Sequence, residues 1–224
     1  HGTVPGALTK AHWEEWMAAT RLAVREAARF VAVPSDSGKH LPLHIVGFSN
    51  GGALTLKYAL DTLSDLTLPK ADQLVLISPM IGITAYARFA GLAGLPAIFP
   101  PFAKAAWLSI LPEFNPFKYN SFPVNGVRQS YLLTSVLQSQ LEQEARQRRL
   151  SQLPPILTFQ SVMDFTVSTR AVISAFYNLL PKNNNNLVLF DVNRTTNFDL
   201  LMRDASAAAI GQLLPPRHGY MAPQ

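Results

Sequence analysis

The stretch LHIVGFSNGG, residues 43–52, decides the fold because it joins a strand, a tight turn and the start of a helix. Residues 43–48 form a short and mostly apolar run, which is typical of a strand buried on both faces of a sheet. Residues 49–52 predict a turn of small residues, and residues 53–63 favour a helix. The stretch therefore predicts a strand–turn–helix unit of the kind that builds α/β proteins.

The same alternation of strands and helices continues along the chain. Parallel neighbouring strands need a helix to cross between them, so this order predicts an α/β fold with a mostly parallel sheet flanked by helices. About four strands are visible in the sequence. Besides the opening stretch, the predicted strands are residues 73–78, 156–160 and 187–192, and the predicted helices are residues 11–30, 169–180 and 198–214.

Residues 80–153 interrupt this alternation with a stretch rich in glycine, proline and aromatic residues, followed by a polar helix at about residues 129–150. We interpret residues 80–153 as a cap inserted into a core formed by residues 1–79 and 154–224. The cap aromatics either form a stiff lid over an acyl pocket or pack on the core, and an amphipathic lid would also contact a lipid interface. These aromatics are Phe89, Phe99, Phe102, Trp107, Phe114, Phe117, Tyr119 and Phe122.

Composition excludes several classes of protein. The chain has no cysteine, so disulfides, thiolate zinc sites and cysteine nucleophiles are excluded. The net charge of +5 is scattered, and the one dense basic group, residues 146–149 beside Glu142 and Glu144, is interpreted as a solvated helix face. We therefore expect no nucleic-acid partner, and no metal or other cofactor. The sequence does not fix the compartment in which the protein works.

Gly47, Ser49 and Gly51 match the motif G-x-S-x-G within the strand–turn–helix unit. In hydrolases that use this motif, the serine stands on a sharp turn that exposes its hydroxyl at the carboxyl edge of the sheet. Gly47 and Gly51 are expected to let the strand and the helix approach closely. The N–H of Asn50 and the positive end of the helix are expected to stabilise a developing oxyanion. Ser49 is therefore the predicted nucleophile, and an ordinary glycine-rich turn is the alternative.

A serine nucleophile needs a base, and the base needs a carboxylate to orient it. In this type of site the chain order is serine, then acid, then histidine. Asp164 lies just past the strand at residues 156–160 and is the predicted acid, with a loop or capping role as the alternative. Asp191 is the competitor, but it precedes Arg194 and is expected to form an ion pair.

The base is harder to locate, because the loop expected to carry it, residues 193–197, contains no histidine. His218 is the one histidine that follows Asp164, so it is the candidate base. The alternatives are that His218 belongs to a frayed tail, or that the base lies beyond this chain. The remaining histidines are His44, expected to pack in its strand, His12, expected at the surface or as a helix cap, and His40 and His1 in loops.

Several segments resemble bacterial esterases and lipases of the α/β-hydrolase superfamily. Residues 1–8, HGTVPGAL, resemble the loop after the fourth strand of these enzymes, and GFSNGG resembles their nucleophile turn. Residues 112–126, PEFNPFKYNSFPVNG, resemble the cap segment of a bacterial carboxylesterase subgroup related to serine aminopeptidase-like hydrolases, and QSVMDFTV resembles its acid loop. The resemblance spans roughly residues 2–194 and implies hydrolysis of esters or lipids, with Ser49 as nucleophile and Asp164 as acid.

We therefore expect a serine hydrolase that cleaves short- to medium-chain acyl esters or lipids through a Ser-His-Asp triad and an acyl-enzyme. The alternative is a catalytically impaired relative that binds a lipid or a partner protein. The family has further strands ahead of the point where this chain begins, so we expect either a truncated α/β-hydrolase fold or a naturally short relative. The resulting free sheet edge would favour homo-oligomers.

Overall fold

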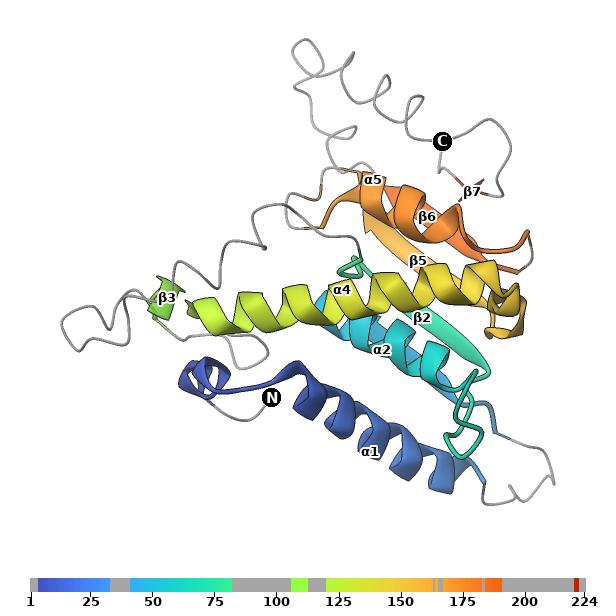
Figure 1. Cartoon of the computed structure of the whole chain (residues 1–224), viewed down its shortest axis with the longest axis horizontal. Helices are drawn as coiled ribbons and strands as arrows, with labels where there is room; N and C mark the ends of the chain where they lie inside the picture. The colour runs from blue at the N-terminus through green and yellow to red at the C-terminus, as the bar shows by residue number, and fades with distance from the viewer. Residues whose placement is uncertain are drawn as a thin grey trace, which may run out of the picture. The chain divides into compact units, whose positions relative to one another are not determined.

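The computed structural model describes residues 4–32, 41–81, 106–112, 120–162, 164, 167–182, 184–190 and 220–221 (Figure 1). The chain divides into two compact units, residues 1–18 with 83–136 and residues 19–82 with 137–224. Helices α1 (Trp13–Val31) and α4 (Val124–Arg146) contribute residues to both units. The role of residues 80–153 as a cap stays a prediction.

The second unit contains a five-stranded sheet in the order β1-β2-β5-β6-β7, in which every pair of neighbours is parallel. This sheet confirms the predicted α/β fold, with a parallel sheet and flanking helices. The short strand β7 was not predicted, since two residues after a proline-rich segment carry no strand pattern. The strands are β1 (His44–Phe48), β2 (Gln73–Ile77), β5 (Ile156–Ser161), β6 (Asn186–Phe190) and β7 (Tyr220–Met221).

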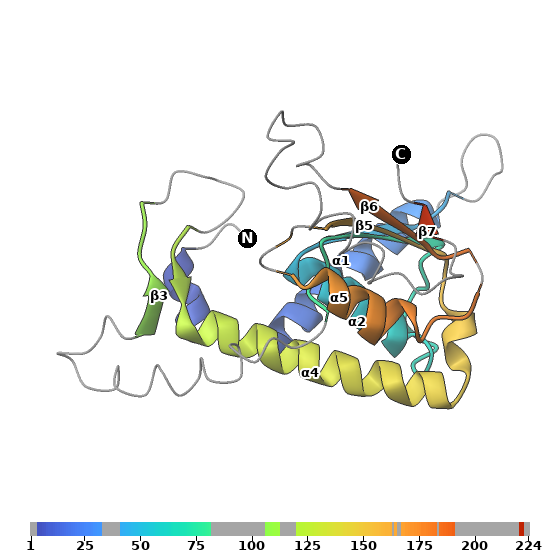
Figure 2. The ribbon, with the colours of Figure 1, turned by 90° about the horizontal axis from the view of Figure 1, so that it is seen from above.

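Helices α2 (Asn50–Asp61) and α5 (Thr169–Val172) lie on the same face of this sheet (Figure 2). A π turn, η5 (Ile173–Tyr177), continues α5. The core forms between these helices and the sheet, because alternate strand residues point toward the helices. The fully buried members of this core include Leu56, Leu60, Leu74, Leu76, Ile156, Phe176 and Leu187.

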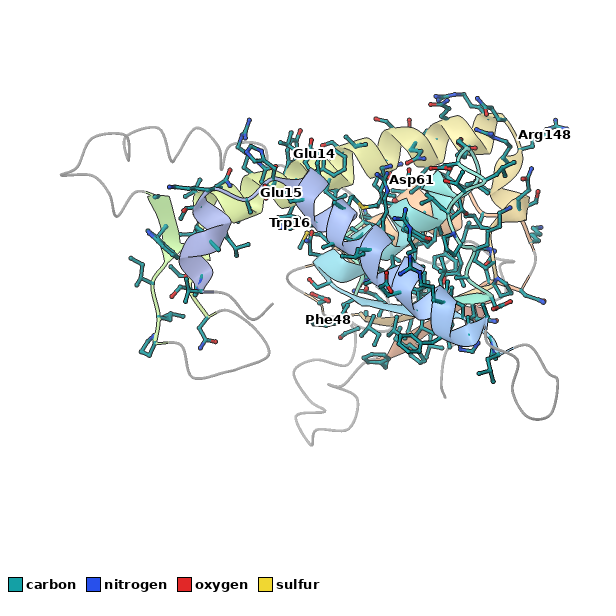
Figure 3. The ribbon with its side chains drawn as sticks, turned by 90° about the horizontal axis from the view of Figure 1, so that it is seen from below. Glu14, Glu15, Trp16, Phe48, Asp61 and Arg148 are labelled. Carbon is teal, nitrogen blue, oxygen red and sulfur yellow. The ribbon has the colours of Figure 1, made fainter. Side chains whose placement is uncertain are left out.

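The expectation that residues 43–48 are buried on both faces is wrong. Val46 is 63% exposed and Phe48 is 66% exposed, whereas Gly47 between them is buried (Figure 3). In the order of the described strands β1 is an edge strand, and α2 packs on the face opposite these two side chains. His44 is exposed as well, so its expected packing role is also wrong.

The basic group at the end of α4 is only partly a solvated face. Arg148 is exposed (Figure 3), and its left-handed backbone at φ 56° ends the helix. The turn places Arg149 beside Glu144, and Arg149 Nη2 donates a hydrogen bond to Glu144 Oε1 at 2.8 Å. The Glu144 side chain is 2% exposed, so the expectation of a solvated carboxylate is wrong at this position. A buried carboxylate needs such a partner to offset its lost hydration.

The first unit is built around the start of α4. The Asn125 side-chain amide donates to the carbonyl oxygens of Leu8 and Ala11, both at 2.9 Å, and so holds the end of the short helix η1 (Pro5–Thr9). The N–H of Trp13 donates to Gln129 Oε1 at 3.2 Å, which ties the start of α1 to α4. The Asn125 and Gln129 amides therefore anchor the N-terminal segment to α4.

The same unit holds a small antiparallel pair, β3 (Trp107–Ser109) and β4 (Phe122–Pro123), which the sequence did not predict. His12 is exposed, which confirms the surface position expected as one of its two alternatives, and its backbone N–H donates to Glu15 Oε2 at 3.0 Å. Of the cap aromatics, Phe89, Phe99, Phe102, Phe114, Phe117 and Tyr119 lie outside the described residues, as does the predicted helix at residues 198–214.

None of the helices that the structure describes has both the length and the apolar character needed to cross a bilayer.

Candidate active site

Ser49 links β1 to α2 through a single residue with backbone angles of φ 51° and ψ −117°. A positive φ is uncommon for a residue with a Cβ, and such strained positions cost about 1–3 kcal/mol. The surrounding structure therefore has to enforce the turn. The predicted strand–turn–helix unit thus contains the sharp, strained turn that its motif requires.

Hydrogen bonds to the neighbouring strand, to the segment after it and to the helix fix the Ser49 backbone. Its N–H donates to the carbonyl of Ile77 at 2.9 Å, and so continues the pairing with β2. Its carbonyl accepts from the N–H of Met80 at 3.0 Å and from that of Gly52 at 2.9 Å. Because both the neighbouring strand and the helix hold the residue, its strained backbone cannot relax without breaking these bonds.

Glycine at position 47 lets the helix approach the strand. A Cβ on Gly47 would lie 2.5 Å from the Gly51 carbonyl oxygen and 2.5 Å from Thr55 Oγ1. A Cβ on Gly52 would lie 2.7 Å from Pro79 Cβ, so the residues after β2 also press on the turn. A Cβ on Gly51 would meet nothing within 4 Å. The expectation that the turn has no room for a side chain is therefore correct at Gly47 and wrong at Gly51. Gly52, which was not expected to matter, has no room for one either.

The hydroxyl of Ser49 lies beside the start of α2. Ser49 occupies the N-cap position, but its side chain makes no capping hydrogen bond. The N–H of Asn50, as the first of the helix, has no carbonyl within the helix to which it could donate. It stands at the positive end of the α2 dipole, where a negative charge is stabilised. The turn therefore places the predicted nucleophile next to a potential oxyanion donor.

Asp164 lies in the loop that follows β5. Its Oδ1 accepts from the N–H of Val167 at 2.9 Å, and its Oδ2 lies 3.4 Å from the Nε2 of Gln160. Its own N–H donates to the Ser161 carbonyl at 3.3 Å. The carboxylate is therefore held at both oxygens by residues of its own loop and strand. Sequence analysis missed Gln160, because one polar residue at the end of a strand carries no motif.

The parallel sheet brings Ser49 and Asp164 to the same edge. Phe48 of β1, Ile77 of β2 and Phe159 of β5 stand at one level in the strand register. Ser49 and Asp164 both follow the carboxyl ends of their strands. One strand separates β1 from β5, so the strand axes are about 10 Å apart. A histidine base that binds both residues would have to lie across β2.

The described residues do not place the predicted base. His218 lies outside them, as do His1, His40, the competitor acid Asp191 and the loop at residues 193–197. His44 stands at the opposite end of β1, five residues from Ser49, which is about 16 Å along a strand. His44 is therefore too far from Ser49 to act as its base.

Within the part of the chain that the structure describes, no three histidine, aspartate or glutamate side chains gather as ligands for a metal ion.

No protein-family model matches the sequence, and no curated protein does. Solved structures similar to this chain include a soluble variant of monoglyceride lipase from Saccharomyces cerevisiae with a substrate analogue, at 12% identity over 80% of this chain and 59% of that chain, with a TM-score of 0.48. A bacterial membrane phospholipase A, described as a virulence factor, has 17% identity, coverage of 82% and 57%, and a TM-score of 0.39.

The esterase domain of a Rhodothermus marinus protein has 16% identity, coverage of 81% of this chain and 59% of that chain, and a TM-score of 0.39. The chain thus spans less than three fifths of the length of each of these structures, 57–59%.

We predict that Gly47→Ala destabilises the protein and that Gly51→Ala does not. The added methyl at position 47 meets a backbone oxygen that cannot move aside, and such overpacking costs about 1–3 kcal/mol. At position 51 the methyl enters open space in the first turn of α2, where alanine is the better helix former. Urea unfolding of both variants checks this. Equal losses of unfolding free energy would contradict the role assigned to Gly47.

Proposed function

We propose that this protein is a serine hydrolase of the α/β-hydrolase type that cleaves carboxylic esters, with Ser49 as its nucleophile. The observation that carries the proposal is the backbone of Ser49, at φ 51° and ψ −117° between a parallel strand and a helix. This turn is the structural context in which G-x-S-x-G acts as a nucleophile motif. An ordinary glycine-rich turn would put glycine, rather than serine, at the strained position.

The proposed reaction is acyl transfer to water in two steps. Ser49 Oγ attacks the ester carbonyl carbon while the base takes the hydroxyl proton, and the carbonyl oxygen becomes an oxyanion near the N–H of Asn50. The tetrahedral intermediate collapses, the bond to the alcohol oxygen breaks, and the base returns its proton to the leaving alcohol. Water then attacks the acyl-enzyme in the same manner and releases the carboxylic acid and free Ser49.

Asp164 is the proposed acid of this triad and His218 the proposed base. Supporting the acid, the Asp164 carboxylate lies at the same edge of the sheet as Ser49 and is oriented by hydrogen bonds. A carboxylate in this position holds the imidazole in the correct tautomer and stabilises the imidazolium that forms during the attack. The choice of His218 rests on chain order alone, because no other histidine follows Asp164.

The proposed substrates are short- to medium-chain acyl esters or lipids, and residues 80–153 are proposed as the cap that receives them. Three exposed apolar side chains in the first unit, Leu108, Ile110 and Leu111, support contact between this cap and a lipid interface. The exposed Val46 and Phe48 on edge strand β1 support the proposal that copies of the chain associate.

Ser49→Ala is expected to lower kcat for p-nitrophenyl butyrate by roughly a thousandfold or more, because no other group replaces the attacking oxygen. The matched control is Ser78→Ala, since Ser78 also has a positive φ, 42°, and follows the neighbouring strand β2. The control should keep activity within a few fold of the parent. Full activity in Ser49→Ala would rule out the mechanism, and an inactive parent would favour a non-catalytic relative that binds lipid or protein.

His218→Ala is expected to lower kcat on the same substrate by at least a hundredfold, since general base catalysis contributes about 10²–10⁴-fold. His44→Ala provides the control, because His44 is exposed at the far end of β1 and should leave kcat unchanged. An unchanged kcat in His218→Ala would mean that another group is the base. The role of Ser49 would be unaffected, because Ser49→Ala tests it separately.

A further inference from the structure

Gln160, near the end of β5, is completely buried, with 0% of its surface exposed. A glutamine in the core costs free energy unless its amide is hydrogen-bonded, since the water that it gives up has to be replaced. An apolar residue would otherwise suit position 160, just as the apolar Ile156 is buried at the other end of the strand. The amide therefore needs a local explanation.

The amide nitrogen of Gln160 faces four oxygen atoms of residues between the end of β5 and the start of α5. Nε2 lies 3.3 Å from the Ser161 carbonyl, 3.4 Å from Asp164 Oδ2, 3.5 Å from the Val167 carbonyl and 3.3 Å from Thr169 Oγ1. Two carbonyls and a carboxylate accept hydrogen bonds but cannot donate them. The reversed amide would set Oε1 against these oxygens, so the nitrogen must face the loop.

The loop closes around this amide. Thr169 Oγ1 donates to the Ser161 carbonyl at 2.8 Å, which joins the end of β5 to the start of α5. The N–H of Val167 holds Asp164 Oδ1 at 2.9 Å, and the Gln160 amide stands on the side of Oδ2. The NH2 group of Gln160 has two hydrogens and four acceptors nearby, so the acceptors share these two hydrogens. It therefore fixes the path of the loop and the rotation of the carboxylate together.

We propose that Gln160 is a positioning residue for the catalytic acid, and that its buried amide sets the orientation in which Asp164 meets the base. This inference rests on the proposed function. Gln160 lies within the core and acts through Asp164, whereas Ser49 and the base contact the substrate. A carboxylate turned away from the imidazole would stabilise the imidazolium less, so the loss would fall on kcat rather than on substrate binding.

The test compares Gln160→Met with Thr158→Val, using p-nitrophenyl butyrate. Gln160→Met keeps the length of the side chain and removes the amide. Thr158 is equally buried, at 0% exposure on the same strand and the same face, but has no contact with the acid loop among the described hydrogen bonds. We expect Gln160→Met to lower kcat on the order of 10–100-fold with KM within about twofold, and Thr158→Val to change neither.

A double-variant cycle with Asp164→Asn separates positioning from simple support of the fold. If Gln160 acts through Asp164, adding Gln160→Met to Asp164→Asn lowers kcat by less than threefold further, because the oriented carboxylate is already lost. Independent effects that multiply would overturn the inference. Gln160→Leu, which also removes the amide and adds no buried charge, repeats the cycle if circular dichroism shows that Gln160→Met is unfolded, and the same loss of kcat is expected.

Different results would overturn the positioning role of Gln160 and the proposed function. If Ser49→Ala abolishes hydrolysis while folded Gln160 variants keep kcat within twofold of the parent, the positioning role is wrong and the proposed function stands. If the parent shows no hydrolysis that depends on Ser49, the proposed function fails, and the role of Gln160 in it fails as well.

Discussion

The backbone of Ser49, held at φ 51° and ψ −117°, is the constraint on which the rest of the site depends. A serine there costs free energy, about 1–3 kcal/mol for such a strained residue, and the structure offsets that cost from two sides. Strand β2 holds it through the carbonyl of Ile77, and the segment after β2 holds it through the N–H of Met80. Gly47 and Gly52 remove the side chains that would push the turn open.

The parallel sheet converts this local turn into a site. Strands β1, β2 and β5 are neighbours with matched register, so the residues after β1 and after β5 emerge at one edge although they are far apart in sequence. The helix that starts at Asn50 adds its positive end at this edge. The loop after β5 adds Asp164, whose two oxygens face the Val167 N–H and the Gln160 amide. A rigid scaffold that carries polar loops is the usual basis of an active site.

The sequence predicted the parts of this arrangement that depend on local pattern. The predicted strands at 43–48 and 156–160 and the predicted helix at 53–63 correspond to β1, β5 and α2, because apolar runs broken by small residues mark them. The motif places Ser49 between β1 and α2. The sequence did not predict properties that depend on neighbours distant in sequence. The exposure of Phe48 follows from the packing of α2 on the opposite face of β1, the tight contact at Gly52 comes from Pro79 after β2, and the role of Gln160 comes from its contacts with residues beyond β5. Similarly, the pairing of Glu144 with Arg149 needs the left-handed turn at Arg148.

The most direct test of the central claim is covalent labelling of the folded protein with a fluorophosphonate probe, followed by mass spectrometry of its peptides. An activated serine displaces fluoride from phosphorus and keeps the phosphonyl group, whereas an ordinary serine hydroxyl reacts far more slowly. If Ser49 is the nucleophile, a single adduct forms on Ser49 and disappears when the protein is unfolded before labelling. Absence of an adduct, or an adduct on another serine such as Ser78, would contradict this role of Ser49.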